Sequence, residues 1–129
     1  MSYNASPKDF VGTWRSIYYI DDNPDYYHHN NGYLYLKIEM TEGPTFFRNK
    51  AKYRIFNRFH HAPSASDSSY TETGMFNNRT KKIESISTDV GWNFSYSSGK
   101  EDFEYYLVSP KKLVRFNSAL GIEEFYRIG

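Results

Sequence analysis

The chain contains no cysteine among its 129 residues. Disulfide bonds are therefore excluded, and no thiol can serve as a nucleophile or a metal ligand. No apolar run approaches the roughly 18 residues of a membrane-spanning helix. The first ten residues also lack the basic and apolar regions of a signal peptide. We therefore expect a cytoplasmic protein without a membrane span.

The sequence also has no large excess of positive or negative charge. The 16 lysine and arginine residues nearly balance the 15 aspartate and glutamate residues, and the formal net charge is +1. No global field therefore favours nucleic acid or a membrane surface. The sequence also lacks the Gly-x-Ser-x-Gly, phosphate-loop, Gly-x-Gly-x-x-Gly and His-Glu-x-x-His patterns of common enzymes. The sequence therefore indicates no particular reaction, and we expect no cofactor.

Aromatic residues are abundant: 13 Tyr, 10 Phe and 2 Trp make up 19% of the chain. Strand formers dominate, and helix formers are under-represented. Residues 33 to 40 alternate cleanly, with Leu34, Leu36 and Ile38 on one face. Turn signals recur at a spacing of roughly 8–12 residues, which is typical of a β-barrel or β-sandwich.

Hairpin-length connections favour an antiparallel up-and-down meander of about 8–10 strands in one all-β domain, residues 1 to 129. One short helical turn is expected at Ser6–Asp9, and a tight turn at Asn77–Asn78. The expected strands cover residues 10–20, 33–40, 47–59, 70–77, 80–88, 91–97, 102–109, 113–118 and 122–128.

The first expected strand opens with Gly12-Thr13-Trp14. A glycine lets backbones crowd at the narrow base of a barrel, and an indole two residues later points to the same face. Gly-x-Trp at this position resembles the signature of the calycins, which include lipocalins and fatty-acid-binding proteins. The resemblance implies a closed barrel with a ligand cavity and a short helical turn before the first strand.

Two further stretches bear on the resemblance. Residues 21 to 32 are too short for the lid helices of fatty-acid-binding proteins, which favours a lipocalin-like barrel with an open mouth. Glu124 stands where the fatty-acid-binding Arg-x-Tyr would place its arginine, so that carboxylate grip does not carry over. Arg127 resembles the basic residue that packs over the indole in lipocalins, a structural cation–π contact.

The abundance of aromatic residues favours a ligand cavity over a solid core, although both remain open. The side chains expected to line it come from most of the strands. They are Trp14, Tyr18, Leu36, Tyr53, Ile55, Trp92, Tyr96, Phe103, Tyr105, Arg115 and Tyr126.

Arg115 lies on an expected strand that carries polar and apolar residues on both faces, so the pattern does not decide whether Arg115 points inward. An inward arginine needs a carboxylate partner, either Glu124 or a group on the ligand.

Two other groups of residues, the histidine pairs and a basic stripe, could form functional sites but also have a purely structural interpretation. His28-His29 and His60-His61 could meet at a barrel mouth, but adjacent histidines in a strand point to opposite faces, and we predict no metal site. The basic stripe of Arg48, Lys50, Lys52, Arg54 and Arg58 could bind nucleic acid, but it is also typical of a solvated outer barrel face.

The favoured function is binding of one small hydrophobic or aromatic molecule in the barrel. The alternative is a small cofactor-free enzyme, such as an isomerase or cyclase of secondary metabolism, that acts on a hydrophobic substrate in the barrel. Its catalytic candidates are Tyr18, His60, Arg115 and Glu124. A third interpretation is a surface-binding module that uses the basic stripe at residues 48–58. The sequence indicates no oligomeric state.

Overall fold

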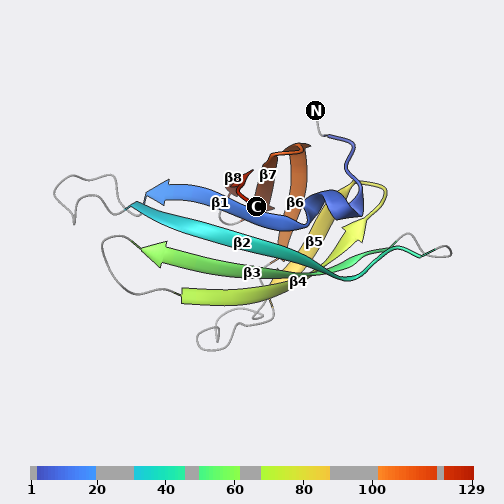
Figure 1. Cartoon of the computed structure of the whole chain (residues 1–129), viewed down its shortest axis with the longest axis horizontal. Helices are drawn as coiled ribbons and strands as arrows, with labels where there is room; N and C mark the ends of the chain where they lie inside the picture. The colour runs from blue at the N-terminus through green and yellow to red at the C-terminus, as the bar shows by residue number, and fades with distance from the viewer. Residues whose placement is uncertain (1–2, 20–30, 46–49, 62–67, 88–101, 119–120) are drawn as a thin grey trace.

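The computed structural model describes residues 3–19, 31–45, 50–61, 68–87, 102–118 and 121–129. In these ranges eight strands form a closed barrel in which each strand pairs with its neighbours in sequence (Figure 1). A 3-10 turn, η1 (Pro7–Phe10), precedes them. The strands are β1 (Gly12–Tyr19), β2 (Asn31–Glu42), β3 (Lys52–His61), β4 (Ser68–Asn77), β5 (Lys82–Ser87), β6 (Asp102–Ser109), β7 (Lys112–Asn117) and β8 (Gly121–Arg127).

The predicted all-β, antiparallel up-and-down barrel is therefore confirmed. The strand expected at residues 91–97 lies outside the described residues. Closure depends on a short pairing between β1 and β8, in which Trp14 lies opposite Arg127 and Arg15 opposite Tyr126. The two ends of the barrel sheet thus meet beside the Gly-x-Trp stretch.

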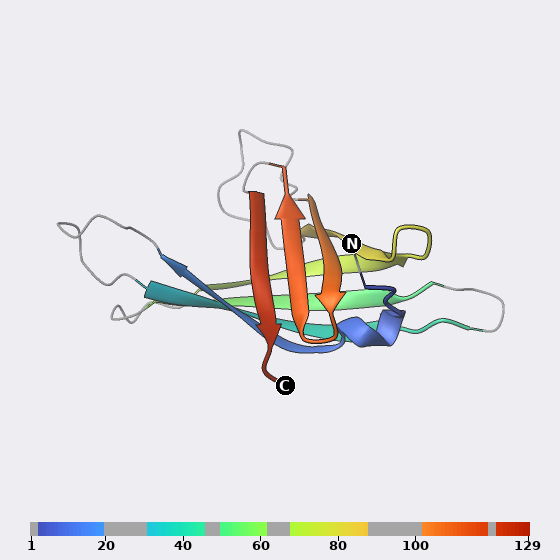
Figure 2. The ribbon, with the colours of Figure 1, turned by 90° about the horizontal axis from the view of Figure 1, so that it is seen from above.

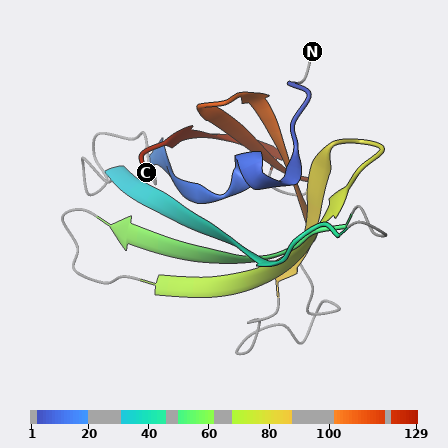
Figure 3. The same cartoon turned by 45° about the vertical axis from the view of Figure 1, so that its right-hand side comes forward.

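The strands form two walls around the interior. Figure 3 shows β2–β4 as one wall and β6–β8 as the opposite wall. Figure 2 shows β6, β7 and β8 running across the longer strands β2–β4. Side chains from both walls meet between them, as Arg115 and Glu72 do, so residues far apart in sequence come together there.

Alternation along β3 explains which side chains face the core. Ala51, Tyr53 and Ile55 are buried, while Lys52 and Arg54 between them are exposed. A strand turns successive side chains to opposite faces, so a period of two in polarity becomes a period of two in burial. The inward facing expected for Tyr53 and Ile55 is therefore confirmed.

The expected helical turn is also present. The backbone N–H and the hydroxyl of Ser6 donate to the Asp9 carboxylate at 2.9 and 3.0 Å. This local pairing fixes the start of η1 and brings Phe10 into the core. In the part of the chain that the structure describes, no helix is long and apolar enough to cross a membrane.

The β4–β5 hairpin turns at residues 78–81, slightly beyond the expected Asn77–Asn78 pair. The Asn77 side-chain oxygen accepts hydrogen bonds from the backbone N–H groups of Arg79 and Thr80 at 2.9 and 3.2 Å. Lys81 takes the positive φ of 61° that completes the turn. An asparagine side chain that caps its own turn is a common local device.

Candidate functional site

One end of the barrel is closed by Trp14 and Arg127. The Arg127 guanidinium carbon lies 4.2 Å from the centroid of the Trp14 ring, and the indole N–H donates to the Phe10 carbonyl at 3.1 Å. Arg127 also donates to the carbonyl oxygens of Val11 at 2.8 Å and Asp9 at 2.6 Å. The predicted cation–π contact between Arg127 and Trp14 is therefore confirmed, and it ties β8 to η1.

Gly12 is required at this closed end for two reasons. Its φ of +146° lies in a region that residues with a side chain rarely adopt. A Cβ atom here would also meet the Arg127 guanidinium and lie 2.7 Å from the Gly129 carbonyl oxygen. The glycine of Gly-x-Trp thus makes room for the arginine that covers the tryptophan.

We expect Gly12→Ala to lower the free energy of unfolding by about 2–3 kcal/mol, because it adds backbone strain and displaces Arg127. Urea unfolding followed by tryptophan fluorescence measures the loss. Gly43→Ala is the matched control, because Gly43 has no positive φ in the structure and its Cβ would meet only the flexible Met40 side chain at 3.3 Å. Equal effects of the two substitutions would contradict the role assigned to Gly12.

An apolar layer of the core lies between Trp14 and the polar interior, and it packs against η1. Tyr53, Leu36 and Ile55 are at most 1% exposed. Phe10 packs edge-on against Tyr53 and Phe76, with ring centroids 6.3 and 6.1 Å apart, and the Tyr53 hydroxyl donates to the Pro7 carbonyl at 2.6 Å. Several of the residues expected to line a cavity therefore pack in the core beneath η1.

A group of polar side chains faces the interior beyond this apolar layer. We call it the polar cluster. Its members come from both walls of the barrel and contact one another directly. They are Asn57, Tyr70, Glu72, Ser85, Tyr105, Arg115 and Glu123.

Glu72 is the fully buried carboxylate of the cluster, with a relative exposure of 0%. Its carboxylate accepts hydrogen bonds from Ser85 at 2.6 Å, from Asn57 at 2.8 Å and from the Tyr105 hydroxyl at 2.7 and 2.8 Å. Burial raises the pKa of Glu72 above its usual value, although Arg115 and these hydrogen bonds oppose the shift. Burial and the Glu72 charge likewise raise the pKa of Tyr105.

Arg115 links Glu72 to the rest of the cluster. Its Nη1 atom lies 3.6 Å from Glu72 and donates to Asn57 at 2.8 Å, and its Nε donates to Glu123 at 2.9 Å. The guanidinium packs over Phe103, 4.6 Å from the ring centroid. Burial alone would lower the pKa of Arg115, but the surrounding tyrosines, Tyr105 first, and the two carboxylates raise the pKa overall, so the guanidinium stays charged.

Two members of the cluster are less buried. The Glu123 side chain is 30% exposed, whereas that of Arg115 beside it is 3% exposed. Tyr70, whose hydroxyl lies 3.4 Å from Arg115 Nη1, is half-buried. Glu123 lies directly opposite Arg115 in the β7–β8 pairing and on the same strand face as the buried Phe125. Solvent therefore reaches the inner barrel surface at this level.

The structure settles the facing of Arg115 and corrects its partner. Arg115 points inward, but it binds Glu123 and Glu72 and not Glu124. Glu124 lies on the outer face and forms an exposed ion pair with Lys112 at 3.2 Å. The predicted inward position of Tyr126 is also wrong, because Tyr126 is 52% exposed. Successive residues of a strand alternate in facing, so an inward Phe125 places both of its neighbours outside.

The other residues expected to line the cavity or to form a histidine cluster are partly described by the structure. Phe103, Tyr105 and Trp14 lie buried inside the barrel. Trp92, Tyr96 and the His28-His29 pair lie outside the described residues, and the side chains of Tyr18, His60 and His61 are not described. Among the described residues, no group of three or more histidine, aspartate or glutamate side chains is arranged to hold a metal ion.

Sequence reasoning missed Glu72, Ser85 and Glu123. One signal for Glu72 was available, because four residues separate it from the apolar Phe76, which places both on one face of the strand. Glu123 likewise shares a face with Phe125. A carboxylate at an inward position of an alternating strand is therefore the feature that marks this cluster.

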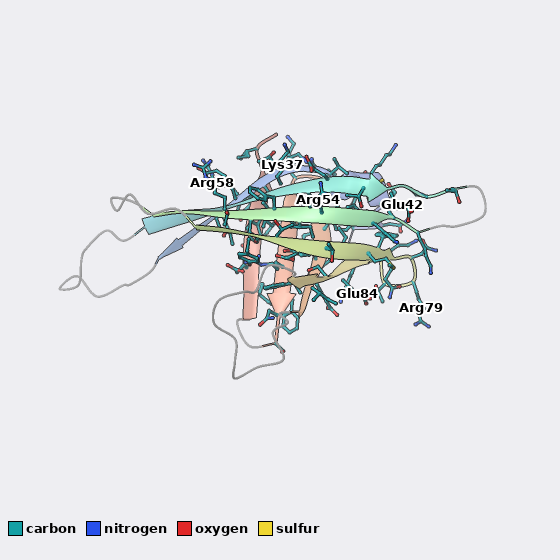
Figure 4. All side chains as sticks on the ribbon, turned by 90° about the horizontal axis from the view of Figure 1, so that it is seen from below. Lys37, Glu42, Arg54, Arg58, Arg79 and Glu84 are labelled. Atoms are coloured by element: carbon teal, nitrogen blue, oxygen red, sulfur yellow. The ribbon has the colours of Figure 1, made fainter. Side chains whose placement is uncertain are left out.

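Three residues of the basic stripe, Lys52, Arg54 and Arg58, lie on the outer face of β3, as Figure 4 shows for Arg54 and Arg58. Arg48 lies outside the described residues. Lys52 lies 3.6 Å from Glu42, and Arg54 lies 3.8 Å from Glu39 on the neighbouring strand. These carboxylates reduce the positive potential that a nucleic-acid backbone would need. They make a solvated barrel face the better interpretation.

A groove of about 490 Å³ opens beside the stripe, on the outer side of β3–β5. It combines charges of both signs with the exposed apolar side chains Met75 and Ile86. Its lining does not include the polar cluster, so the groove and the barrel interior are separate features. The lining consists of Thr41, Lys52, Tyr53, Arg54, Thr73, Gly74, Met75, Glu84 and Ile86.

No family model matches this chain, and no curated protein gives a significant match to it. The functional conclusion therefore depends on the geometry of the polar cluster.

Proposed function

We propose that the protein binds one small molecule inside the barrel, beside the half-exposed members of the polar cluster. The observation that carries the proposal is the contrast between Glu123, 30% exposed on the inner face, and Arg115, 3% exposed beside it. An accessible, charged inner surface within a β-barrel is a typical setting for a ligand that needs orientation as well as burial. The half-buried Tyr70 supplies aromatic surface at the same level, and Phe103 packs behind the Arg115 guanidinium.

The proposed ligand lies above the packed apolar layer, not within it. Tyr53, Leu36 and Ile55 would support the site from below. Direct contacts would come from the less buried Tyr70 and Glu123, with Arg115 and Phe103 packed behind them. Tyr18, Trp92 and Tyr96 remain expected contributors. Apolar area buried by the ligand would contribute roughly 25 cal/mol per Å².

We also propose a relationship to the lipocalin-like calycins. Three features support it: the closed meander, the η1 turn before β1, and the stacking of Arg127 over Trp14 beside Gly12. These are the features that the Gly-x-Trp resemblance implied.

Catalysis in the barrel is the second candidate. The observation that favours it is the hydrogen bond between Tyr105 and Glu72, two buried groups whose pKa values are both raised. Such a pair can move a proton during a cofactor-free isomerisation or cyclisation. Both groups are fully buried, so their contact with a substrate would have to pass through Arg115, and simple binding remains the better-supported function.

The test of binding is a titration with N-phenyl-1-naphthylamine, a neutral aromatic probe that fluoresces in apolar sites. We expect saturable binding that weakens by roughly tenfold in Tyr70→Ala, because this change removes inner aromatic surface. Tyr126→Ala is the control, since Tyr126 lies outside and is 52% exposed. Far-UV circular dichroism establishes that both variants are folded.

Equal weakening by the two variants, or none in the Tyr70 variant, would show that the probe does not bind inside the barrel. Native mass spectrometry of protein purified from its own cells then identifies the ligand by mass. Incubating the purified protein with that ligand distinguishes turnover from binding.

A further inference from the structure

The charges of the polar cluster constrain the chemistry of its ligand. The cluster contains one guanidinium, that of Arg115, and two carboxylates, those of Glu72 and Glu123. We infer that the ligand carries a cationic, hydrogen-bond-donating head group, such as an ammonium, on an apolar or aromatic body. This inference depends on the proposed barrel site and specifies what that site selects.

Arg115 is already committed to groups of its own chain. Its Nε and Nη2 atoms both donate to Glu123, and its Nη1 donates to Asn57 at 2.8 Å. Phe103 and Phe125 lie against the guanidinium, with ring centroids 4.6 and 5.4 Å from its central carbon. A ligand carboxylate would have to displace Glu123 from Arg115 and then remain beside it as a like charge. An anionic head group is therefore disfavoured.

Glu123, in contrast, is placed to bind a cation, because Arg115 donates hydrogen bonds to one of its two carboxylate oxygens. It is the outer member of its pair with Arg115, because its side chain is 30% exposed and that of Arg115 is 3% exposed. Both hydrogen bonds from Arg115 end on the same oxygen, Oε1, so Arg115 does not use Oε2. An ammonium could approach this carboxylate without displacing Arg115.

The inference holds for either charge state of Glu72. If Glu72 is ionised, the three charges of the cluster sum to −1, which attracts a cation. Burial raises the pKa of Glu72 and thus favours its neutral form. With Glu72 neutral, the remaining pair sums to zero, and its negative member still faces the accessible side. In neither state does the cluster present the excess positive charge that an anion requires.

The test compares two aromatic compounds of similar shape and opposite charge, tryptamine and indole-3-propionate, as competitors of bound N-phenyl-1-naphthylamine at pH 7. We expect tryptamine to compete at least about tenfold better than indole-3-propionate with the unmodified protein. Glu123→Gln should remove most of that preference. Glu124→Gln, the adjacent carboxylate on the outer face, should leave the preference unchanged.

The comparison in the unmodified protein does not depend on any variant folding. If the neutral probe binds and indole-3-propionate competes as well as tryptamine or better, the cationic head group is wrong while the barrel site stands. If Glu124→Gln removes the preference as strongly as Glu123→Gln, the charge selection does not come from the inner face and the inference is overturned. If the neutral probe itself does not bind, the proposed function fails and this inference fails with it.

Discussion

Replacing Arg115 with methionine is expected to lower the free energy of unfolding by about 3–5 kcal/mol at neutral pH. Methionine can fill much of the space between Phe103 and Phe125, so the loss comes mainly from charge. Without the guanidinium, the fully buried carboxylate of Glu72 loses the cation that lies 3.6 Å away, and Asn57 loses its 2.8 Å hydrogen bond. A buried charge without a partner is among the most destabilising single changes.

The cost of Arg115→Met should grow with pH. Removing Arg115 takes away a cause that lowers the pKa of Glu72, so that pKa, already raised in the folded protein, rises further. A folded state that holds its proton more tightly than the unfolded chain loses stability as pH rises above the unfolded value, which is 4.5 for glutamate here. Urea unfolding at pH 5 and pH 8 should therefore show the larger loss at pH 8.

Two variants sharpen this experiment. Adding Glu72→Gln to Arg115→Met removes the buried charge and should recover part of the stability, most clearly at pH 8. Arg54→Met is the matched control, because Arg54 is 58% exposed and its ion pair with Glu39 is long, at 3.8 Å. Its cost should stay under about 1 kcal/mol. A loss of that small size for Arg115→Met would show that the buried ion pair contributes little to stability.

The fold could be predicted because the alternation in β2 and β3 is clean. Apolar residues such as Leu36 and Ile55 face inward, and charged residues such as Lys37 and Arg54 alternate with them on the outer face. Such a pattern stabilises one register and disfavours a slip of one residue, which would expose the whole apolar face. The closed end followed from the Gly-x-Trp resemblance, including the stacking of Arg127 on Trp14.

The polar cluster could not be predicted in the same way, because its strands carry polar residues on both faces. In β7 the pattern did not decide between the face of Arg115 and that of Val114, and both proved to be buried. The partner of Arg115 depends on the β7–β8 register, which aligns it with Glu123 and turns Glu124 outward. Glu72 comes from the opposite wall, and its 3.6 Å approach to Arg115 is set by how the two walls meet.

Alkaline unfolding is the second large effect that we expect, and it comes from the interior tyrosines Tyr53, Tyr70 and Tyr105. Burial raises the pKa of Tyr70 from 10.0 to about 12, with Arg115 opposing the shift. It also raises the pKa of Tyr53, with the Asp9 charge adding to the effect, and the pKa of Tyr105, where Glu72 adds to it. The folded protein therefore keeps these hydroxyl groups protonated at a pH where the unfolded chain ionises them.

The sign of the pH dependence follows from this difference. The stability is fully present below pH 10 and is lost as pH rises toward 12, because the folded state then binds more protons than the unfolded state. Each such tyrosine can contribute a slope of about 1.4 kcal/mol per pH unit, so the three together can reach roughly 4 kcal/mol per unit. We expect cooperative unfolding between pH 10 and pH 12, with a step in tyrosinate absorbance near 295 nm at the same pH as the loss of near-UV circular dichroism.

Tyr53→Phe separates this effect from the titration of surface lysines. It removes one of the three proton-binding hydroxyls, so the slope of unfolding free energy against pH above pH 10 should fall by about a third, whatever stability is lost at neutral pH with the 2.6 Å bond to Pro7. Tyr126→Phe is the matched control, because Tyr126 is 52% exposed on the outer face. If all tyrosines instead ionise smoothly near pH 10 while the near-UV spectrum stays native, then Tyr53, Tyr70 and Tyr105 are accessible to solvent and the closed apolar layer beneath the polar cluster does not exist in solution.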